Sequence, residues 1–225
     1  MPEPVTDNLQ QSMQSLSEHY NRLVREHGYA PESVHFSSWE TIERRFEILL
    51  EGFPDHRTSR ILDFGCGIGH LLGYLQRHGF NGEYVGYDIA KGMIDLARSR
   101  YPDTRFEHRN LLQSPPEESF DMAFVSGVFN NATDCNRQFM EQSLRTLFNV
   151  VTRGVAFNAL SRYVHYRDEG LHYCCPMEVF EFCKQELTPR VALRHDYELK
   201  PNVIPFEFTI YLYKSANEPV TGIQG

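Results

Sequence analysis

The sequence predicts an α/β protein whose core is a doubly wound, mostly parallel sheet of seven strands. From Arg60 onward, short apolar segments alternate with amphipathic segments of helical periodicity, which is typical of parallel strands covered by helices on both faces. The last two apolar segments have no helix between them, so the final strand is expected to run antiparallel. Two helical segments precede the first strand.

The expected elements follow from the spacing of apolar residues and from the glycines and prolines between them. Helices are expected over residues 12–27, 39–51, 70–78, 91–100, 137–151 and 177–186. Strands are expected over residues 60–64, 84–88, 105–108, 121–126, 154–160, 190–197 and 206–213. We therefore divide the chain into an N-terminal helical unit (1–57), the sheet with its helices (58–215) and a polar, flexible tail (216–225).

The charge, the apolar runs and the cysteines of the chain indicate which partners, compartment and metal sites to expect. The chain has 225 residues and a formal net charge of −8, and no stretch concentrates Lys and Arg, so a nucleic-acid partner is not expected. The apolar runs are too short to span a bilayer, and no signal peptide is visible, so no membrane partner is expected. The 5 cysteines lack the spacing of a disulfide framework or zinc site, which favours free thiols in the cytoplasm and predicts no metal.

A glycine-rich turn follows the first predicted strand. Residues 62–69 read LDFGCGIG, with glycines at 65, 67 and 69 and the acidic Asp63 ahead of them. Such glycines allow positive φ and let a ligand lie against bare backbone. A dinucleotide-binding GxGxxG turn would place its third glycine at position 70, where this chain has His70.

A carboxylate ends the second predicted strand. Asp88 is placed where both of its oxygens can accept hydrogen bonds from the hydroxyls of a ribose. In open α/β sheets the ligand lies outside the carboxyl ends of the strands, and both the turn and Asp88 fall at that edge.

Taken together, LDFGCGIGHLLGYL, YVGYDIAKGMIDLAR and FDMAFVSGVF resemble the class I methyltransferases that use S-adenosylmethionine (SAM). The resemblance implies a Rossmann-like fold, SAM as cofactor and methyl transfer as the activity. It also implies that Asp63, Gly65, Gly67 and Gly69 hold the amino acid part of SAM and that Asp88 holds the ribose. Adenine would then pack on Ile89 and Met93. Asn110 and Leu111 replace the acidic residue that often meets the adenine amino group, and Ser126 lies where the family lines the path of the methyl group.

The two leading helices resemble the lids that small-molecule methyltransferases place over their cofactor. Within them, Tyr20 and Trp39 are candidates for contact with the acceptor, although a lone tryptophan is more often a core residue. Arg45 could pair with the SAM carboxylate, or form a surface ion pair with Glu43 or Glu47.

Polar side chains after strands four and five are further candidates for the acceptor site, since function concentrates on loops at this edge. They are Phe129, Asn130, Asn131, Asn158 and Tyr173. If the acceptor needs a general base, the candidates are His165, His172 and His195.

The resemblance leaves the acceptor open. The NPPY-type turn of many amino-methylating nucleic-acid enzymes is absent, as is the acidic hairpin of arginine methyltransferases, which favours methylation of an oxygen or nitrogen of a small molecule. The alternatives are a SAM-binding regulatory module without turnover and an RNA or protein methyltransferase. The sequence does not distinguish a monomer from a homodimer.

Overall fold

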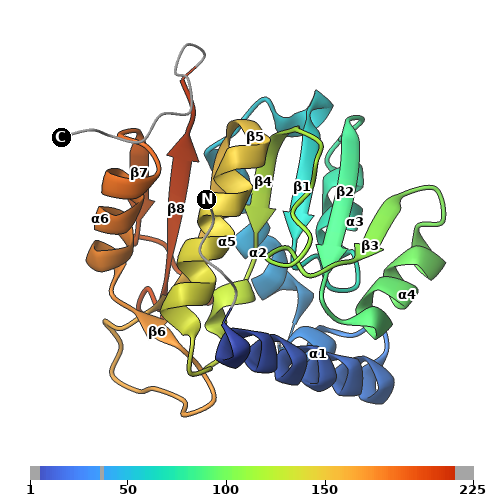
Figure 1. The fold of residues 1–225 in the computed structure, drawn as a ribbon, viewed down its shortest axis with the longest axis horizontal. Coiled ribbons are helices and arrows are strands. Elements are labelled where there is room, and N and C mark those ends of the chain that lie inside the picture. The colour runs from blue at the N-terminus through green and yellow to red at the C-terminus, as the bar shows by residue number, and fades with distance from the viewer. Residues whose placement is uncertain (1–5, 36–37, 216–225) are drawn as a thin grey trace.

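The computed structural model, which describes residues 6–35 and 38–215, is built around a single mixed sheet (Figure 1). Its strands lie in the order β3–β2–β1–β4–β5–β8–β7, and a two-residue β6 pairs with the end of β5. The strands are β1 (Arg60–Phe64), β2 (Glu83–Asp88), β3 (Arg105–His108), β4 (Phe120–Val125), β5 (Val151–Ser161), β6 (Tyr173–Cys174), β7 (Val191–Arg194) and β8 (Glu207–Tyr213).

The direction of the strands confirms the predicted topology. Strands β1 to β5 are parallel, whereas β8 is antiparallel to both β5 and β7. The chain builds the sheet outward from β1 to β3 and then returns to β4 on the other side of β1, which creates a switch point between them. The sequence did not predict β6, because two residues show no period.

Six helices accompany the sheet within the described residues, as predicted. They are α1 (Asp7–His27), α2 (Trp39–Glu51), α3 (His70–Arg77), α4 (Lys91–Arg100), α5 (Asn136–Val150) and α6 (Pro176–Glu186), with short 3₁₀ turns η1 (Pro31–Val34), η2 (His56–Thr58) and η3 (Val128–Asn130). Helix α1 starts five residues before its predicted start at 12, because Thr6 caps it by accepting a hydrogen bond from the Leu9 N–H.

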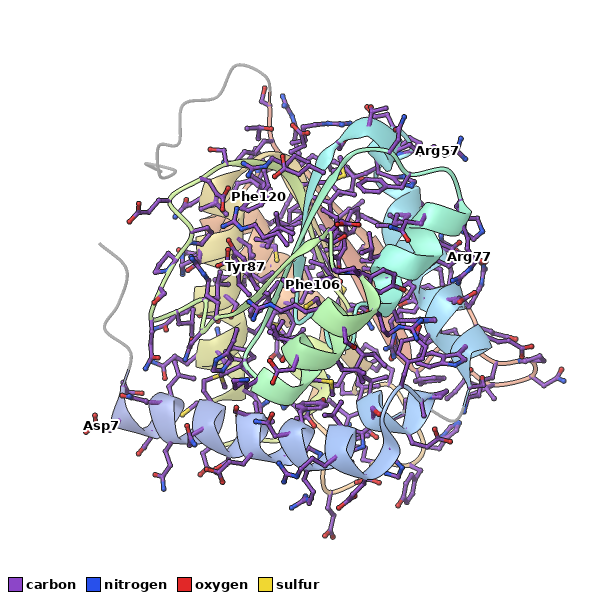
Figure 2. The ribbon with its side chains drawn as sticks, turned by 90° about the vertical axis from the view of Figure 1, so that its right-hand side faces the viewer. Asp7, Arg57, Arg77, Tyr87, Phe106 and Phe120 are labelled. Atoms are coloured by element: carbon purple, nitrogen blue, oxygen red, sulfur yellow. The ribbon has the colours of Figure 1, made fainter. Side chains whose placement is uncertain are left out.

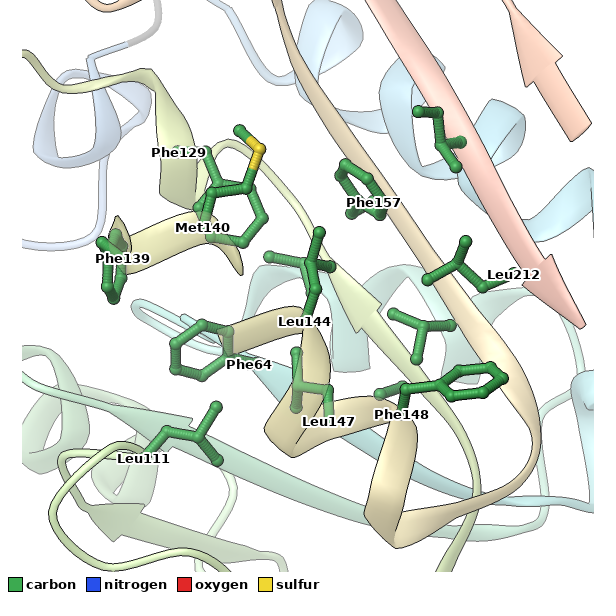
Figure 3. Packing of buried hydrophobic residues seen from close by; sticks show 14 of the residues in the cluster. Phe64, Leu111, Phe129, Phe139, Met140, Leu144, Leu147, Phe148, Phe157 and Leu212 are labelled. Carbon is green, nitrogen blue, oxygen red and sulfur yellow. The ribbon is translucent and has the colours of Figure 1, made fainter. Parts of the chain in front are cut away.

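Side chains alternate between the two faces of the sheet. Ile61 packs with α2, α3 and α4, whereas its neighbour Leu62 packs on the face covered by α5 and α6. Figure 3 shows part of the second face, where Phe64 and Phe157 of the strands meet Leu144 and other side chains of α5. Both faces are therefore apolar, as a parallel sheet requires.

Helix α1 does not cover a face of the sheet. Figures 1 and 2 show it lying across the edge where the parallel strands end, with its first turns buried at Leu9 and Met13. Ser17 donates a hydrogen bond to the Ile89 carbonyl oxygen at 2.8 Å, and Asn21 accepts one from the Gly92 N–H at 2.7 Å. These contacts hold α1 over the segment that follows β2.

The proposed division at residue 57 stays a prediction, and the predicted tail (216–225) lies outside the described residues. Helix α2 packs on the sheet itself, since Ile42, Phe46 and Leu49 join the core cluster beneath α3. No helix in residues 6–35 and 38–215 is long and apolar enough to cross a membrane.

The packing of Gly154 in β5 against Leu212 in β8 gives a stability prediction. A Cβ on Gly154 would lie 2.0 Å from the Leu212 carbonyl oxygen, so the paired strands would have to separate. We expect Gly154→Ala to lower the free energy of unfolding by ~1–3 kcal/mol in a urea titration. Gly170→Ala is the matched control, because its Cβ would meet only the Asp168 side chain, at 3.3 Å. Equal unfolding midpoints for the two variants would contradict the prediction.

Candidate functional site

The turn after β1 is shaped by glycines with positive φ. The φ angle is 76° at Gly65, 52° at Gly67 and 76° at Gly69, a region that other residues rarely adopt. Gly65 donates its N–H to the Tyr87 carbonyl oxygen at 2.8 Å, which ties the turn to β2. A Cβ on Gly65 would lie 2.2 Å from Cγ2 of Val128. Glycine is thus needed both for the conformation and for the close approach of the segment after β4.

Asp88, the last residue of β2, holds the same turn from the other side. Its Oδ2 accepts the Gly67 N–H and its Oδ1 accepts the Ala90 N–H, both at 2.8 Å. Burial raises the pKa of the Asp88 carboxyl, and these two hydrogen bonds lower it in part. Each oxygen still has a lone pair for a further donor. The carboxylate therefore both fixes the turn and can bind a hydroxyl.

Asp63, inside β1, is the second buried carboxyl group beside the turn. The Tyr84 hydroxyl donates a hydrogen bond to its Oδ2 at 2.5 Å. Burial raises the pKa of Asp63 to about 7, against the opposing effect of this hydrogen bond. The group is thus balanced between its neutral and charged forms near neutral pH.

A cavity of about 520 Å³ runs along the carboxyl ends of the strands. This volume is typical of a small-molecule binding site. The cavity reaches from Asp88 at the end of β2 to Glu207 at the start of β8, and Met13, Leu16 and Tyr20 of α1 line its outer side. Of the predicted cofactor-binding residues, those that line it are Arg45, Asp63, Gly65, Gly67, Asp88, Ile89, Met93, Asn110, Leu111 and Ser126.

Gly69 is the exception among the predicted cofactor residues. It is the N-cap of α3, and a Cβ there would lie 3.1 Å from Phe106 and 3.2 Å from Tyr101. The third glycine is therefore needed for close packing of the start of α3 against these two rings, and its predicted contact with SAM stays a prediction.

The predicted acceptor residues divide into two groups. Tyr20, Asn130 and Asn131 line the cavity, and the Asn131 side-chain amide donates a hydrogen bond to the Tyr20 hydroxyl at 2.7 Å. This bond joins α1 to the segment after β4 across the cavity. The structure thus brings together residues more than one hundred positions apart in the chain.

Four predicted acceptor residues do not line this cavity: Trp39, Phe129, Asn158 and Tyr173. Trp39 stacks on His70 with ring centroids 4.0 Å apart, and Phe129 is buried in the core beside Phe157 (Figure 3). Tyr173 lines a separate cavity of about 310 Å³. Trp39 and Phe129 thus pack against other rings and Asn158 is buried, whereas Tyr173 belongs to the other cavity. A role for these four residues in binding the acceptor stays a prediction.

The three histidines predicted as general bases are not among the residues that line this cavity either. His165 is exposed, and His172 lines the same separate cavity as Tyr173. His195 follows β7, and its Nε2 lies 3.2 Å from the Pro205 carbonyl oxygen. The loop after β5 returns to the cavity at Leu171, which bridges to Asn131, but its histidines are not among the lining residues. Its position in the sequence did not determine which of its side chains line the cavity.

Two histidines that the sequence reasoning did not select do line the cavity, His35 and His70. His70 is held by the Tyr29 hydroxyl, 2.8 Å from Nδ1, and by Glu43, 3.1 Å from Nε2. Burial lowers the pKa of His70 to about 4, so it is neutral at physiological pH. The sequence did contain one sign that His70 differs from an ordinary helix residue. It occupies the position at which a dinucleotide-binding motif has its third glycine.

Arg45 and Glu207 form a buried ion pair at the β8 end of the cavity. Arg45 donates from Nε to Oε2 of Glu207 at 2.9 Å and from Nη2 to Oε1. The surface pair with Glu43 or Glu47 is therefore wrong. Asn158 donates to the same Oε2 at 2.6 Å and accepts the Gly127 N–H at 2.9 Å. Asn158 thus links Glu207 to the turn after β4 from beneath the cavity wall.

Glu207 could not be selected from the sequence. It lies in the predicted last strand among apolar residues, where a single charged residue usually faces solvent. Only the insertion of β8 between β5 and β7 brings Glu207 to this end of the cavity and its side chain to Arg45. Within the described residues, no group of three or more His, Cys, Asp and Glu side chains is arranged to hold a metal ion.

Comparisons with known proteins agree with this geometry. A family model described as a methyltransferase domain matches residues 61–154. The chain is 32% identical over 163 residues to a Mycobacterium tuberculosis protein named as a methyltransferase with no stated substrate; the match covers 69% of this chain and 93% of the relative. It is 31% identical over 80 residues to trans-aconitate 2-methyltransferase of Methylobacterium nodulans, a match that covers 36% of this chain and 31% of that enzyme.

Solved structures share the fold at low identity. Magnesium protoporphyrin IX methyltransferase from Synechocystis PCC 6803, crystallised with SAH, has a TM-score of 0.64 at 12% identity, covering 91% of this chain and 100% of that one. The same enzyme crystallised with SAM has a TM-score of 0.63. Similarity over nearly the whole mycobacterial relative, on a fold whose solved examples are crystallised with SAM or SAH, shows that the chain belongs to the class I SAM-dependent methyltransferase family, with SAM as its cofactor.

Proposed function

We propose that this methyltransferase transfers the methyl group of SAM to an oxygen or nitrogen of a small molecule. The observation that carries the proposal is the enclosure of the cavity, whose outer side is formed by Met13, Leu16 and Tyr20 of α1. A space of about 520 Å³ with such a wall suits a cofactor and a small acceptor better than a folded macromolecule. The net charge of −8 also opposes binding to RNA.

The residues at the β2 side of the cavity fit SAM. We propose that Asp88 binds the ribose hydroxyls through the lone pairs that its backbone contacts leave available. Asp63 and the glycine turn would hold the amino acid part. Adenine would pack on Ile89 and Met93, near Asn110 and Leu111, while Ser126 lies toward the reacting methyl group; all of these residues line the cavity.

SAM supplies an electrophilic methyl group, so the protein has to position the acceptor and exclude water. Near-attack positioning is worth ~7–11 kcal/mol in favourable cases. The hydrogen bond between Tyr20 and Asn131 fixes α1 against the segment after β4, on which the acceptor would rest. The pairing of Arg45 with the SAM carboxylate stays a prediction, because the structure shows Arg45 already bound to Glu207.

The role of Asp88 is tested by calorimetric titration of SAM. We expect Asp88→Ala to weaken SAM binding at least about 100-fold, because two hydrogen bonds to a charged group are lost. Asp95→Ala is the control, since Asp95 is exposed on α4 and pairs with Lys91 of the same helix. An affinity for Asp88→Ala equal to that of the control would refute the assignment.

The raised pKa of Asp63 predicts a pH dependence of SAM binding. Below a pKa of about 7 the carboxyl is protonated and cannot pair with the SAM ammonium group. Raising the pH from 6 to 8 should therefore tighten binding by up to about tenfold in wild type, with release of a proton. In Asp63→Asn the dissociation constant should not change over this range. A wild-type profile as flat as that of the variant would exclude the role.

The class of acceptor is tested with SAM carrying a labelled methyl group. Purified protein is incubated with labelled SAM and a cell extract that has been separated into small metabolites, RNA and protein. We expect label in the metabolite fraction and none above the no-enzyme background in the other two. Label in RNA or protein alone would replace the proposed function by a macromolecular acceptor.

A further inference from the structure

The cavity extends beyond the part proposed for SAM. Reading across the sheet edge, Asp88 ends β2, the glycine turn follows β1 and Ser126 follows β4, and these surround the proposed cofactor. Beyond them lie Leu160 near the end of β5 and Phe206 just before β8, which also line the cavity. This β8 end of the cavity is therefore the space left for the acceptor.

The connection between β7 and β8 supplies part of the wall at this end. Its backbone is anchored on the protein, because the Tyr197 hydroxyl lies 2.8 Å from the Thr209 hydroxyl and Leu199 is buried beside Ile48 of α2. The residue that follows Leu199 is Lys200, which lines the cavity and is exposed. Lys200 thus stands at the rim of the cavity on a stretch of chain whose position is fixed.

Lys200 differs from the other lysines of the chain, which are Lys91, Lys184 and Lys214. Lys91 forms an ion pair, Lys184 donates a hydrogen bond to a backbone carbonyl oxygen, and Lys214 lies over an aromatic ring. Across residues 6–35 and 38–215, the ammonium group of Lys200 has no carboxylate, hydrogen-bond acceptor or ring as a partner. Its charge is therefore available to a ligand.

The other Asp, Glu and Arg side chains of the cavity wall are paired or lie at the SAM end. Arg45 pairs with Glu207 inside the wall, and Arg109 pairs with a glutamate of β3. Asp63 and Asp88 lie beside the glycine turn, where SAM brings its ammonium and sulfonium charges. An anionic group is thus repelled at the SAM end, whereas at the β8 rim it meets a cation.

We infer that Lys200 binds a negatively charged group of the methyl acceptor, so that the acceptor is an organic anion. This inference rests on the proposed function and names the class of its substrate. A carboxylate or a phosphate suits the site, because both accept hydrogen bonds from an ammonium group. Leu160, Leu171 and Phe206 are apolar side chains that line the cavity, and they would contact the hydrocarbon part of the acceptor.

The anionic group bound at the rim is not the group that is methylated. With the anion held by Lys200, a different oxygen or nitrogen of the acceptor points inward to SAM. The lone pair of that atom forms the bond to the methyl carbon, the carbon–sulfur bond breaks, and its electron pair stays on sulfur. A proton on the attacking atom passes to water, and the anionic group keeps its charge. The product is therefore an anion as well.

The charge of the acceptor is tested with the wild-type enzyme. Small metabolites of the cell extract are passed over an anion exchanger at neutral pH, and the flow-through and the desalted eluate are each incubated with protein and labelled SAM. We expect label transfer with the eluate alone, and a labelled product that is retained on a second passage. Transfer with the flow-through, or a product that is not retained, overturns the inference and leaves the proposed function intact. Transfer with neither fraction overturns the proposed function itself.

The two kinds of anionic group are distinguished by treating the eluate with alkaline phosphatase before the reaction. Loss of transfer identifies a phosphate monoester as the group bound at Lys200. Unchanged transfer identifies a carboxylate, which the phosphatase does not remove.

Variants of Lys200 test the residue, with the eluate as the source of acceptor. Lys200→Gln should raise the apparent KM for the eluate at least about fivefold, since a charge-assisted hydrogen bond at the rim is lost. Its kcat and its dissociation constant for SAM should stay within about twofold of wild type, because Lys200 contacts neither the reacting atoms nor the cofactor. Lys200→Arg keeps the charge and should keep KM within about threefold of wild type. Lys184→Gln makes the same chemical change at an exposed position of α6 outside the cavity and should leave KM unchanged.

Salt dependence separates binding of an anion from a structural role. Raising the salt concentration from roughly 50 to roughly 500 mM should raise the wild-type KM about threefold, because salt screens an exposed ion pair. The KM of Lys200→Gln should change less over the same range. Folding of the variant is checked by far-UV circular dichroism. A folded Lys200→Gln variant with the wild-type KM, or one that loses affinity for SAM instead, would overturn the role of Lys200.

Discussion

The hydrogen bond from the Gly67 N–H to the Asp88 carboxylate is the contact on which the site depends. It joins the turn after β1 to the end of β2, and the other oxygen of the same carboxylate caps the segment that leads into α4. One side chain thereby sets the position of two backbone segments that a cofactor must touch. Burial of this charge is unfavourable by itself, and the two N–H groups offset that cost in part.

The topology of the sheet explains why a single edge carries so much chemistry. Parallel strands bring their carboxyl ends to one side, where the loops that follow them meet. The antiparallel β8 adds its beginning to that edge, so Glu207 lies beside the same cavity as residues at the ends of β2, β1 and β4. Helix α1 then closes the space through Tyr20 and Ser17, which bind the segments after β4 and β2.

The two ends of the cavity differ in their charge balance. Near Asp63 and Asp88, carboxyl groups are buried with hydroxyl and backbone partners only, which suits a ligand that brings positive charge. At the other end, Glu207 is paired with Arg45, so the cavity there is polar but balanced. A buried ion pair contributes little to stability by itself, because desolvation of both groups opposes their attraction. The pair is better explained by the geometry that it imposes, which extends through Asn158 to Gly127.

The sequence by itself determined the order of strands and helices, the antiparallel last strand and most of the residues around the proposed SAM site. These depend on local signals: apolar periods, glycines at a strand–helix turn, and an acidic residue at a strand end. The residues at the β8 end of the cavity were decided only by the tertiary structure. Glu207 looks like any strand residue until β8 is inserted beside β5. The loop with His165 and His172 reaches the cavity through Leu171 and not through either histidine. Which side chains share a cavity depends on long-range packing, and packing between distant segments leaves no periodic trace in a single sequence.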